Sequence, residues 1–135
     1  MDLTTWQQHI ELWFEQHYDG GDASHDIAHF HRVWRSAQQI ADGQSVCLTV
    51  VLFASYFHDL VSLPKNHPDR ARSSLLSAER TVQTLSSDFP QLPVEHHAAI
   101  AHAIEAHSFS AQITPQTIEA KIVQDADRLE ALGAI

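Results

Sequence analysis

Residues 46–59 read Val46-Cys47-Leu48-Thr49-Val50-Val51-Leu52-Phe53-Ala54-Ser55-Tyr56-Phe57-His58-Asp59, an apolar run that ends in a His-Asp pair. As far as about Phe57 the run is apolar on nearly every side of a helix, which is typical of a helix packed all round by others. We therefore expect this segment to be the central helix of the fold. The polar pair that closes it then lies in apolar surroundings, where a carboxylate is costly unless it is paired or bound to a metal.

The rest of the chain is also predicted to be helical, because apolar residues recur three and four positions apart and no long run alternates with period two. Paired glycines at 20–21 end the first helix, and Asp22 or Ser24 caps the second. Asp69 and Pro115 mark the starts of two later helices. The expected helices cover residues 6–18, 27–41, 46–57, 69–85, 94–107 and 115–132, with a turn at 89–93 and a loop at 108–114. The fold class is therefore all-α.

The length and charge of the chain limit the kinds of partner it can have. A chain of 135 residues is enough for one domain and short for two. Its formal net charge is −9, with no run of lysine and arginine. A nucleic acid polymer is therefore not an expected partner, because phosphate contacts need clustered cations. A small phosphorylated substrate remains compatible, since a bound cation reverses the field in its own pocket.

The cellular setting is read from cysteine use and from the absence of targeting signals. Cys47 is the only cysteine, so no intrachain disulfide can form, and its thiol is expected to pack in the core. The polar N-terminus does not resemble a signal peptide, and no apolar segment reaches the roughly twenty residues that cross a bilayer. We expect a cytoplasmic protein without membrane contact. The apolar end at residues 131–135 suggests the N-terminal part of a longer chain, with part of the pocket contributed by residues beyond it.

Imidazole and carboxylate groups flank the His-Asp pair in both directions along the sequence. His29 precedes the pair in a histidine-rich segment, and Asp125 and Asp127 follow it. Mixed nitrogen and oxygen ligands suit Mn, Fe, Co, Ni or Zn at a catalytic site with open positions. Neighbouring side chains on a helix point about 100° apart, so His58 and Asp59 can share an ion only at a helix end or side-on. Taken singly, each of these residues is also compatible with a buried, hydrogen-bonded histidine or a surface charge.

Three segments of the chain resemble the signature blocks of the HD superfamily of metal-dependent phosphohydrolases. The segments are His29-x-x-Arg32-Val33, Tyr56-Phe57-His58-Asp59 and Asp125-Ala126-Asp127-Arg128-Leu129. The wider pattern is similar to a bacterial subgroup that includes the YedJ-like proteins. The resemblance implies that residues 1–135 form one HD domain, a bundle of about six or more helices. It also implies a divalent metal (Mn, Mg, Ni, Co, Fe or Zn) held by His29, His58, Asp59 and Asp127.

Several further residues are candidates for catalysis or substrate binding. Asp59 or Asp125 is expected to orient the attacking water, and His107 to protonate the leaving oxygen, since imidazole titrates near neutrality. Arg128 follows the last ligand and is expected to contact the substrate phosphate. Three other candidates lie outside the ligand motifs: His25 is four residues before His29, and Lys65 and Arg72 follow the His-Asp pair. For these three, a helix cap or a solvated surface is the open alternative. For Arg128 the alternative is a surface ion pair, and for His107 it is a hydrogen-bonded structural histidine.

The resemblance implies hydrolysis of a phosphorylated small molecule, with a nucleotide as the favoured substrate, by attack of a metal-bound water. One alternative is a di-iron oxygenase of the same fold, for which His96, His97, His102 and His107 are the available extra ligands. Another is a nucleotide-sensing HD domain without catalytic activity. The sequence leaves the base, the number of phosphates and the oligomeric state open, and a homodimer is compatible with it.

Overall fold

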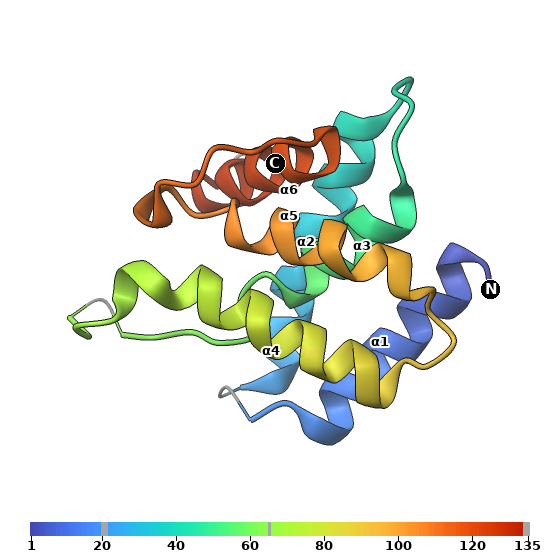
Figure 1. Cartoon of the computed structure of the whole chain (residues 1–135), viewed down its shortest axis with the longest axis horizontal. Coiled ribbons are helices and arrows are strands. Elements are labelled where there is room, and N and C mark those ends of the chain that lie inside the picture. The colour runs from blue at the N-terminus through green and yellow to red at the C-terminus, as the bar shows by residue number, and fades with distance from the viewer. Residues whose placement is uncertain (20–21, 65, 134–135) are drawn as a thin grey trace.

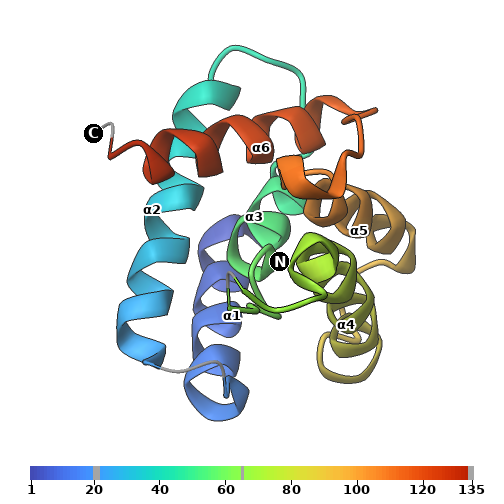
Figure 2. The same cartoon turned by 90° about the vertical axis from the view of Figure 1, so that its left-hand side faces the viewer.

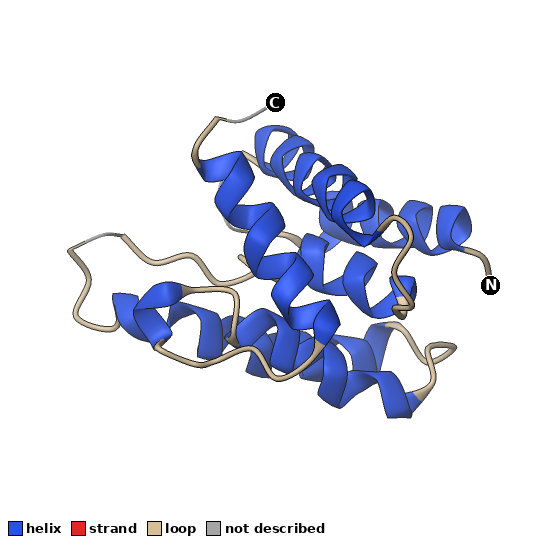
Figure 3. Cartoon of the chain, turned by 90° about the horizontal axis from the view of Figure 1, so that it is seen from above, coloured by secondary structure: helices blue, strands red, loops and turns tan. Residues whose placement is uncertain are grey.

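The structure is a bundle of helices arranged around one central helix (Figure 1). The computed structural model describes residues 1–19, 22–64 and 66–133 of the chain. Within those residues there are six α-helices and no strand (Figure 3), which confirms the all-α prediction. The helices are α1 (Leu3–His17), α2 (Ala23–Ala41), α3 (Leu48–Phe57), α4 (Ser73–Asp88), α5 (His97–Glu105) and α6 (Ile118–Ala131).

Helix α3 is the centre of the bundle, as its apolar sequence predicts. Each of the other five α-helices contacts it, and in Figure 2 it lies between α2 on one side and α4 and α5 on the other. Its residues from Val50 to Phe57 are all buried. Aromatic rings fill the space on the α1 side, with the Phe57 ring centroid 5.0 Å from Phe14 and 6.1 Å from Phe89. The C-terminal end of α3, where His58 follows, therefore lies inside the molecule.

Side-chain acceptors mark the starts of α1, α2 and α6, but not those of α3, α4 and α5. Asp22 rather than Ser24 caps α2, because its side chain accepts the N–H of His25. Helix α3 begins at Leu48, two residues later than predicted, and its N-cap Cys47 makes no side-chain cap hydrogen bond. Cys47 is half-buried against the core instead of fully enclosed. Helix α2 ends at Ala41 as predicted, with Gly43 at a φ of 78°.

Three segments that were expected to be helix or loop form short 3-10 turns instead. The turn η1 (Arg70–Arg72) precedes α4, so Asp69 starts a 3-10 turn and makes no side-chain cap. The turn η2 (Val94–His96) precedes α5, which ends before His107. The turn η3 (Phe109–Ala111) lies inside the predicted loop.

The predicted start of the last helix at Pro115 is wrong. For the first helix, the end of α1 itself can be described, but not the glycines that were expected to end it. Helix α6 begins at Ile118, where the side chain of Thr117 accepts the N–H of Ala120. Proline has no side-chain acceptor to offer, so threonine determines the start. Helix α1 ends at His17 with Tyr18 as its C-cap, and Gly20 and Gly21 lie outside the described residues. In the described part of the chain, no helix combines the length and the apolar character needed to cross a bilayer.

Candidate metal centre

His58 is fully buried at the end of α3 and points one bare nitrogen into a cluster of polar groups. Its relative exposure is 0%. Its Nδ1 lies 2.7 Å from the carbonyl oxygen of Ser55, one turn earlier in the helix. A carbonyl oxygen can only accept, so Nδ1 carries a proton and donates it. In the neutral imidazole, Nε2 is therefore left with a lone pair, as a metal ligand requires.

Two carboxylates face that lone pair. His58 Nε2 lies 3.3 Å from Asp59 Oδ2 and 3.2 Å from Asp127 Oδ1. Despite these distances, it makes no well-directed hydrogen bond with any described residue. A lone pair that faces two carboxylates is repelled by them unless a proton or a metal cation lies between. The arrangement therefore fits a divalent cation, whose positive charge would balance the carboxylates and accept the nitrogen lone pair.

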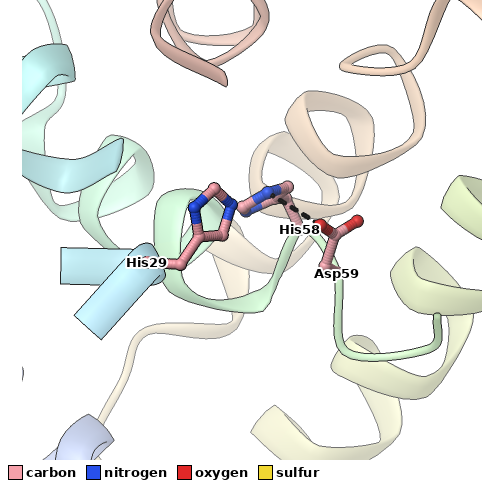
Figure 4. Close-up of side chains that lie close together, drawn as sticks. All are labelled: His29, His58 and Asp59. Carbon is pink, nitrogen blue, oxygen red and sulfur yellow. Dashed lines mark ion pairs between the residues drawn. The ribbon is translucent and has the colours of Figure 1, made fainter. Parts of the chain in front are cut away.

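His29 brings a second imidazole to the same place from helix α2 (Figure 4). It is half-buried, and its ring centroid lies 5.8 Å from that of His58. One ligand atom each from His29, His58 and Asp59 lie within 4.8 Å of one another. Asp127 reaches His58 from helix α6 on the other side. The structure thus brings His29, His58 and Asp59 into one possible metal-binding group, whereas Asp127 contacts His58 but belongs to a second group that shares only His58 with the first.

The protonation of the cluster follows from burial and from the mutual attraction of its charges. Burial disfavours the imidazolium of His58, but Asp59 and Asp127 outweigh it and raise the pKa of His58 well above its usual value. Burial also opposes ionisation of the two carboxyl groups, and His58 outweighs it, so the pKa values of Asp59 and Asp127 are lowered. Burial and the neighbouring His58 lower the pKa of His29. The two carboxylates therefore stay ionised at neutral pH.

His107 joins the cluster from the end of α5. It is buried, its Nδ1 lies 2.5 Å from the Ile104 carbonyl oxygen, and its Nε2 lies 3.7 Å from Asp59 Oδ1. Its ring centroid is 4.9 Å from that of His58. Ligand atoms of His58, His107 and Asp127 form a second group within 4.8 Å of one another. The two oxygens of Asp59 thus face two imidazoles that are each anchored by a backbone carbonyl.

Arg128 and Asp125 flank Asp127 in the sequence but have different positions on α6. The residues of α6 that line the cleft beside the cluster are Gln124, Asp127, Arg128 and Ala131, which share one face of the helix. Asp125 is two residues from Asp127, about 200° away around the helix, and does not line that cleft. The structure therefore does not bring Asp125 to the cluster. The alternative of a surface ion pair for Arg128 is also not seen among the described residues, because its guanidinium lies over the ring of Phe109.

The other expected substrate contacts lie away from the cluster or outside the described residues. His25 is exposed and lies 3.8 Å from its neighbour Asp26. Arg72 is exposed and does not line the cleft, and Lys65 is outside the described residues. Arg70 lines the cleft instead, held by a hydrogen bond from its Nη1 to the Leu63 carbonyl oxygen at 2.6 Å. Arg70 and Arg72 share one short turn, so their sequence alone offers no signal for choosing between them.

A cleft and a groove flank the cluster on different sides of α6. The cleft has a volume of about 330 Å³, and it is bordered by Asp59, His107 and Asp127 of the cluster and by two arginines, Arg70 and Arg128. Five serines also line it: Ser62, Ser73, Ser74, Ser108 and Ser110. The groove, of about 570 Å³, runs between α2 and α6 and includes His29. Its residues Arg32 and Glu130 form an ion pair at 3.3 Å, and Ser36 donates a hydrogen bond to Glu130.

A second metal would need ligands from His96, His97, His102 or His107. Among the described residues, only His107 of these four belongs to a possible metal-binding group. His102 accepts a hydrogen bond from the backbone N–H of Gln116 through Nε2, and its Nδ1 lies 3.4 Å from Glu105. His96 and His97 lie at the other end of α5, where that helix begins. The described structure therefore offers one compact cluster.

Comparison with known proteins agrees with this arrangement. Residues 26–132 match the model of the family described as HD domain. This range contains the expected ligands His29, His58, Asp59 and Asp127, and also His107. The chain is also 31% identical over 132 residues to the uncharacterized protein YpgQ of Bacillus subtilis (strain 168). That alignment covers 95% of this chain and 61% of the relative, so the chain spans about three fifths of the relative's length. With this match and the His…His-Asp…Asp cluster in place, the chain belongs to the HD domain family.

Proposed function

We propose that this protein is a metal-dependent phosphohydrolase that acts on a phosphorylated small molecule, with nucleotides as the first candidates. One observation carries the proposal: the buried Nε2 of His58 faces two carboxylates and has no well-directed hydrogen-bond partner among the described residues. Hydrolysis needs such a centre beside a cavity that accepts an anion. The cleft next to Asp59 and Asp127 is that cavity, and it carries two arginines.

His29, His58, Asp59 and Asp127 are the residues that would hold the metal. When bound, a divalent ion supplies Lewis acidity toward a phosphoryl oxygen and makes water a better nucleophile at neutral pH. The donor set of two imidazoles and two carboxylates suits Mn, Fe, Co, Ni or Zn, and Mg less well because Mg favours oxygen ligands. The anchored Nδ1 of His58 keeps its ring from turning, which preserves the orientation of Nε2 toward the cluster.

Arg70 and Arg128 would bind and orient the phosphate. Lysine and arginine together number only 8 in a chain of net charge −9, yet two of these residues line this one cleft. Guanidinium groups bind phosphate through paired N–H donors, and they stabilise charge that develops on phosphoryl oxygens. The serine hydroxyls of the cleft wall add donors of lower strength. A small anion is therefore favoured there despite the acidic surface of the protein.

His107 would hold the proton that the leaving oxygen needs. Its Nδ1 already donates to the carbonyl of Ile104, so the transferable proton is the one on Nε2. Asp59 faces that nitrogen and would stabilise the imidazolium before transfer. Asp59 would thus serve both as a metal ligand and as the carboxylate that faces the general acid His107. Asp125 lies on another face of α6, away from the cleft, and would not orient the water.

The di-iron oxygenase receives less support from the same site. Two irons need several imidazoles in addition to His29 and His58, and in the described structure only His107 is added to the cluster. A non-catalytic sensor of nucleotides would need neither the ionised carboxylates nor a second anchored histidine. The phosphohydrolase uses each of these groups.

The test is to measure the metal content of the purified protein together with phosphate and pyrophosphate release from a panel of phosphorylated compounds. We expect about one metal per chain and release that depends on Mn, Co or Ni. Asp59→Ala should abolish release, whereas Asp69→Ala, which removes an exposed carboxylate from a 3-10 turn, should leave it unchanged. Two irons per chain without release would favour the oxygenase. Release by the Asp59→Ala variant at the normal rate would refute the proposal.

A further inference from the structure

Phe109 is a large aromatic side chain that the fold leaves 62% exposed at the edge of the catalytic cleft. It lies on η3, between Ser108 and Ser110, which also line the cleft. The turn η3 contacts η1, so Phe109 shares its rim with Arg70. A single exposed apolar residue is ordinary on protein surfaces. What distinguishes Phe109 is its contact with a cation from the opposite wall.

Arg128 provides that contact from helix α6. Its guanidinium carbon lies 4.1 Å from the centroid of the Phe109 ring, within the range of a cation–π interaction. No hydrogen bond or ion pair of the Arg128 side chain occurs within the part of the chain that the structure describes. Its N–H donors are therefore available to a ligand while the ring of Phe109 holds the guanidinium in place. Asp127, the preceding residue, belongs to the His58 cluster, and the pair lines the same cleft as Asp127.

The pair offers a flat surface and hydrogen-bond donors side by side. Nucleobases stack on phenylalanine rings, and the donors of the adjacent Arg128 can bind the phosphate of the same ligand. The cleft of about 330 Å³ is at the lower end of the range for small-molecule sites, enough for one compact ligand. A ligand with its phosphate at the cluster would extend its other end past Arg128 to Phe109.

We propose that Phe109, stacked with Arg128, selects the planar aromatic end of the substrate, which is the base of a nucleotide whose phosphate lies beside Asp59 and Asp127. The inference rests on the proposed phosphohydrolase function for the position of that phosphate. It assigns a role to Phe109 that depends on the ring itself. Sugar phosphates without a base should therefore bind more weakly than the corresponding nucleotides.

Binding of ligands that cannot be hydrolysed to the manganese-loaded protein tests this apart from turnover. Calorimetry would compare the phosphonate analogues of adenosine 5′-monophosphate and of ribose 5-phosphate, in which carbon replaces the bridging ester oxygen. The second has the same phosphonate and sugar and lacks the base. We expect Phe109→Ala to weaken binding of the nucleotide analogue about tenfold, as the loss of one stacked base does, and to change binding of the ribose analogue by less than about twofold. Phe109→Trp should retain nucleotide affinity, and Phe109→Leu, which keeps the bulk without the ring, should lose it.

The control is Val94→Ala, which shortens another exposed apolar residue on a different 3-10 turn, η2. It should leave both affinities unchanged. Equal losses for the two ligands in Phe109→Ala would mean that Phe109 acts on phosphate through Arg128, and would overturn the proposal. A wild-type protein with no preference for the nucleotide would overturn it as well. Phosphate release from the wider panel decides the phosphohydrolase function separately, because it includes compounds without a base.

Discussion

At the scale of single residues, the chemistry depends on which nitrogen of an imidazole is left bare. His58 and His107 lie at the ends of different helices, and each donates its Nδ1 proton to a carbonyl three residues earlier. Each ring therefore directs Nε2 toward the same carboxylate, Asp59. The last carbonyls of a helix have no partner within the regular ladder, and these two rings bond to such carbonyls; that of Ile104 also accepts the backbone N–H of His107. The backbone thus orients both imidazoles.

Two aspartates on one helix provide a matched test of the metal ligands. We expect Asp127→Asn to lower metal content and to reduce activity by at least about a hundredfold, because it removes a carboxylate that faces His58. Asp125→Asn makes the same chemical change two residues away on another face of α6 and should retain both. Elemental analysis and initial rates measure the two effects. Similar losses in both variants would show that Asp125 contributes to the site after all.

The stability of the metal-free protein should fall as pH rises above neutrality, because the pKa of His58 is raised well above its usual value of 6.5. A histidine with a higher pKa in the folded state stabilises folding fully below pH 6.5, and this contribution is lost as pH rises through the folded pKa. The lowered pKa of His29 acts in the acid range instead: folding stability falls as pH drops from 6.5 toward the folded-state pKa of His29. Urea unfolding between pH 6 and 8.5 measures the fall. Added manganese should abolish it, since the cation replaces the proton, and an equal fall with manganese would contradict this account.

At the scale of elements, helix α6 caps helix α3. The N-cap residue of α3, Cys47, makes no side-chain cap hydrogen bond, and its backbone N–H donates to Glu119 Oε2 in the first turn of α6 at 3.0 Å. Near the other end of each helix lie His58 and Asp127, which face each other in the candidate metal centre. The two helices that carry opposing groups of the cluster are therefore joined at both ends.

We expect Glu119→Ala to lower the free energy of unfolding by about 1 kcal/mol, the typical effect of losing a helix-end hydrogen bond. Glu119→Gln retains an oxygen acceptor and should lose less. Lys121→Ala, an exposed change two residues later on the same helix, should fall within about 0.5 kcal/mol of wild type. Urea titration of the three variants gives these values. A loss for Lys121→Ala as large as that for Glu119→Ala would mean that the loss does not come from the hydrogen bond between Cys47 and Glu119.

At the scale of the whole molecule, the stability of the bundle depends on the burial of α3. Leu52 in its middle is 0% exposed, whereas Leu12 on α1 is 51% exposed. Replacing a fully buried leucine with alanine removes apolar contacts and leaves a cavity, which costs about 2–5 kcal/mol. Leu52→Ala should lose that much stability and Leu12→Ala less than about 1 kcal/mol. Thermal and urea unfolding compare the two, and similar losses would show that α1 packs on a surface beyond the described contacts.

The helical class and the central helix could be predicted from sequence because they depend on local patterns, whereas the proposed ligand set came from a family resemblance. The all-round apolar character of residues 48–57 indicated a buried helix, and a polar pair at its end indicated a site that needs a compensating charge. The start of α6 was predicted three residues early, because the proline signal was weaker than the cap that Thr117 supplies. The choice of Asp127 over Asp125 came from a family resemblance, since adjacent polar positions on a helix look alike in a one-dimensional pattern.

What the sequence determined by itself is the set of helices and the types of group that meet, because periodicity and residue chemistry are properties of short segments. Only the tertiary structure decided which side chains meet. It placed Arg70 rather than Arg72 at the cleft, stacked Arg128 on Phe109, and left His25 in solvent. These outcomes depend on how helices far apart in the chain pack against one another. Long-range packing sets the direction of each side chain, and no local pattern encodes it.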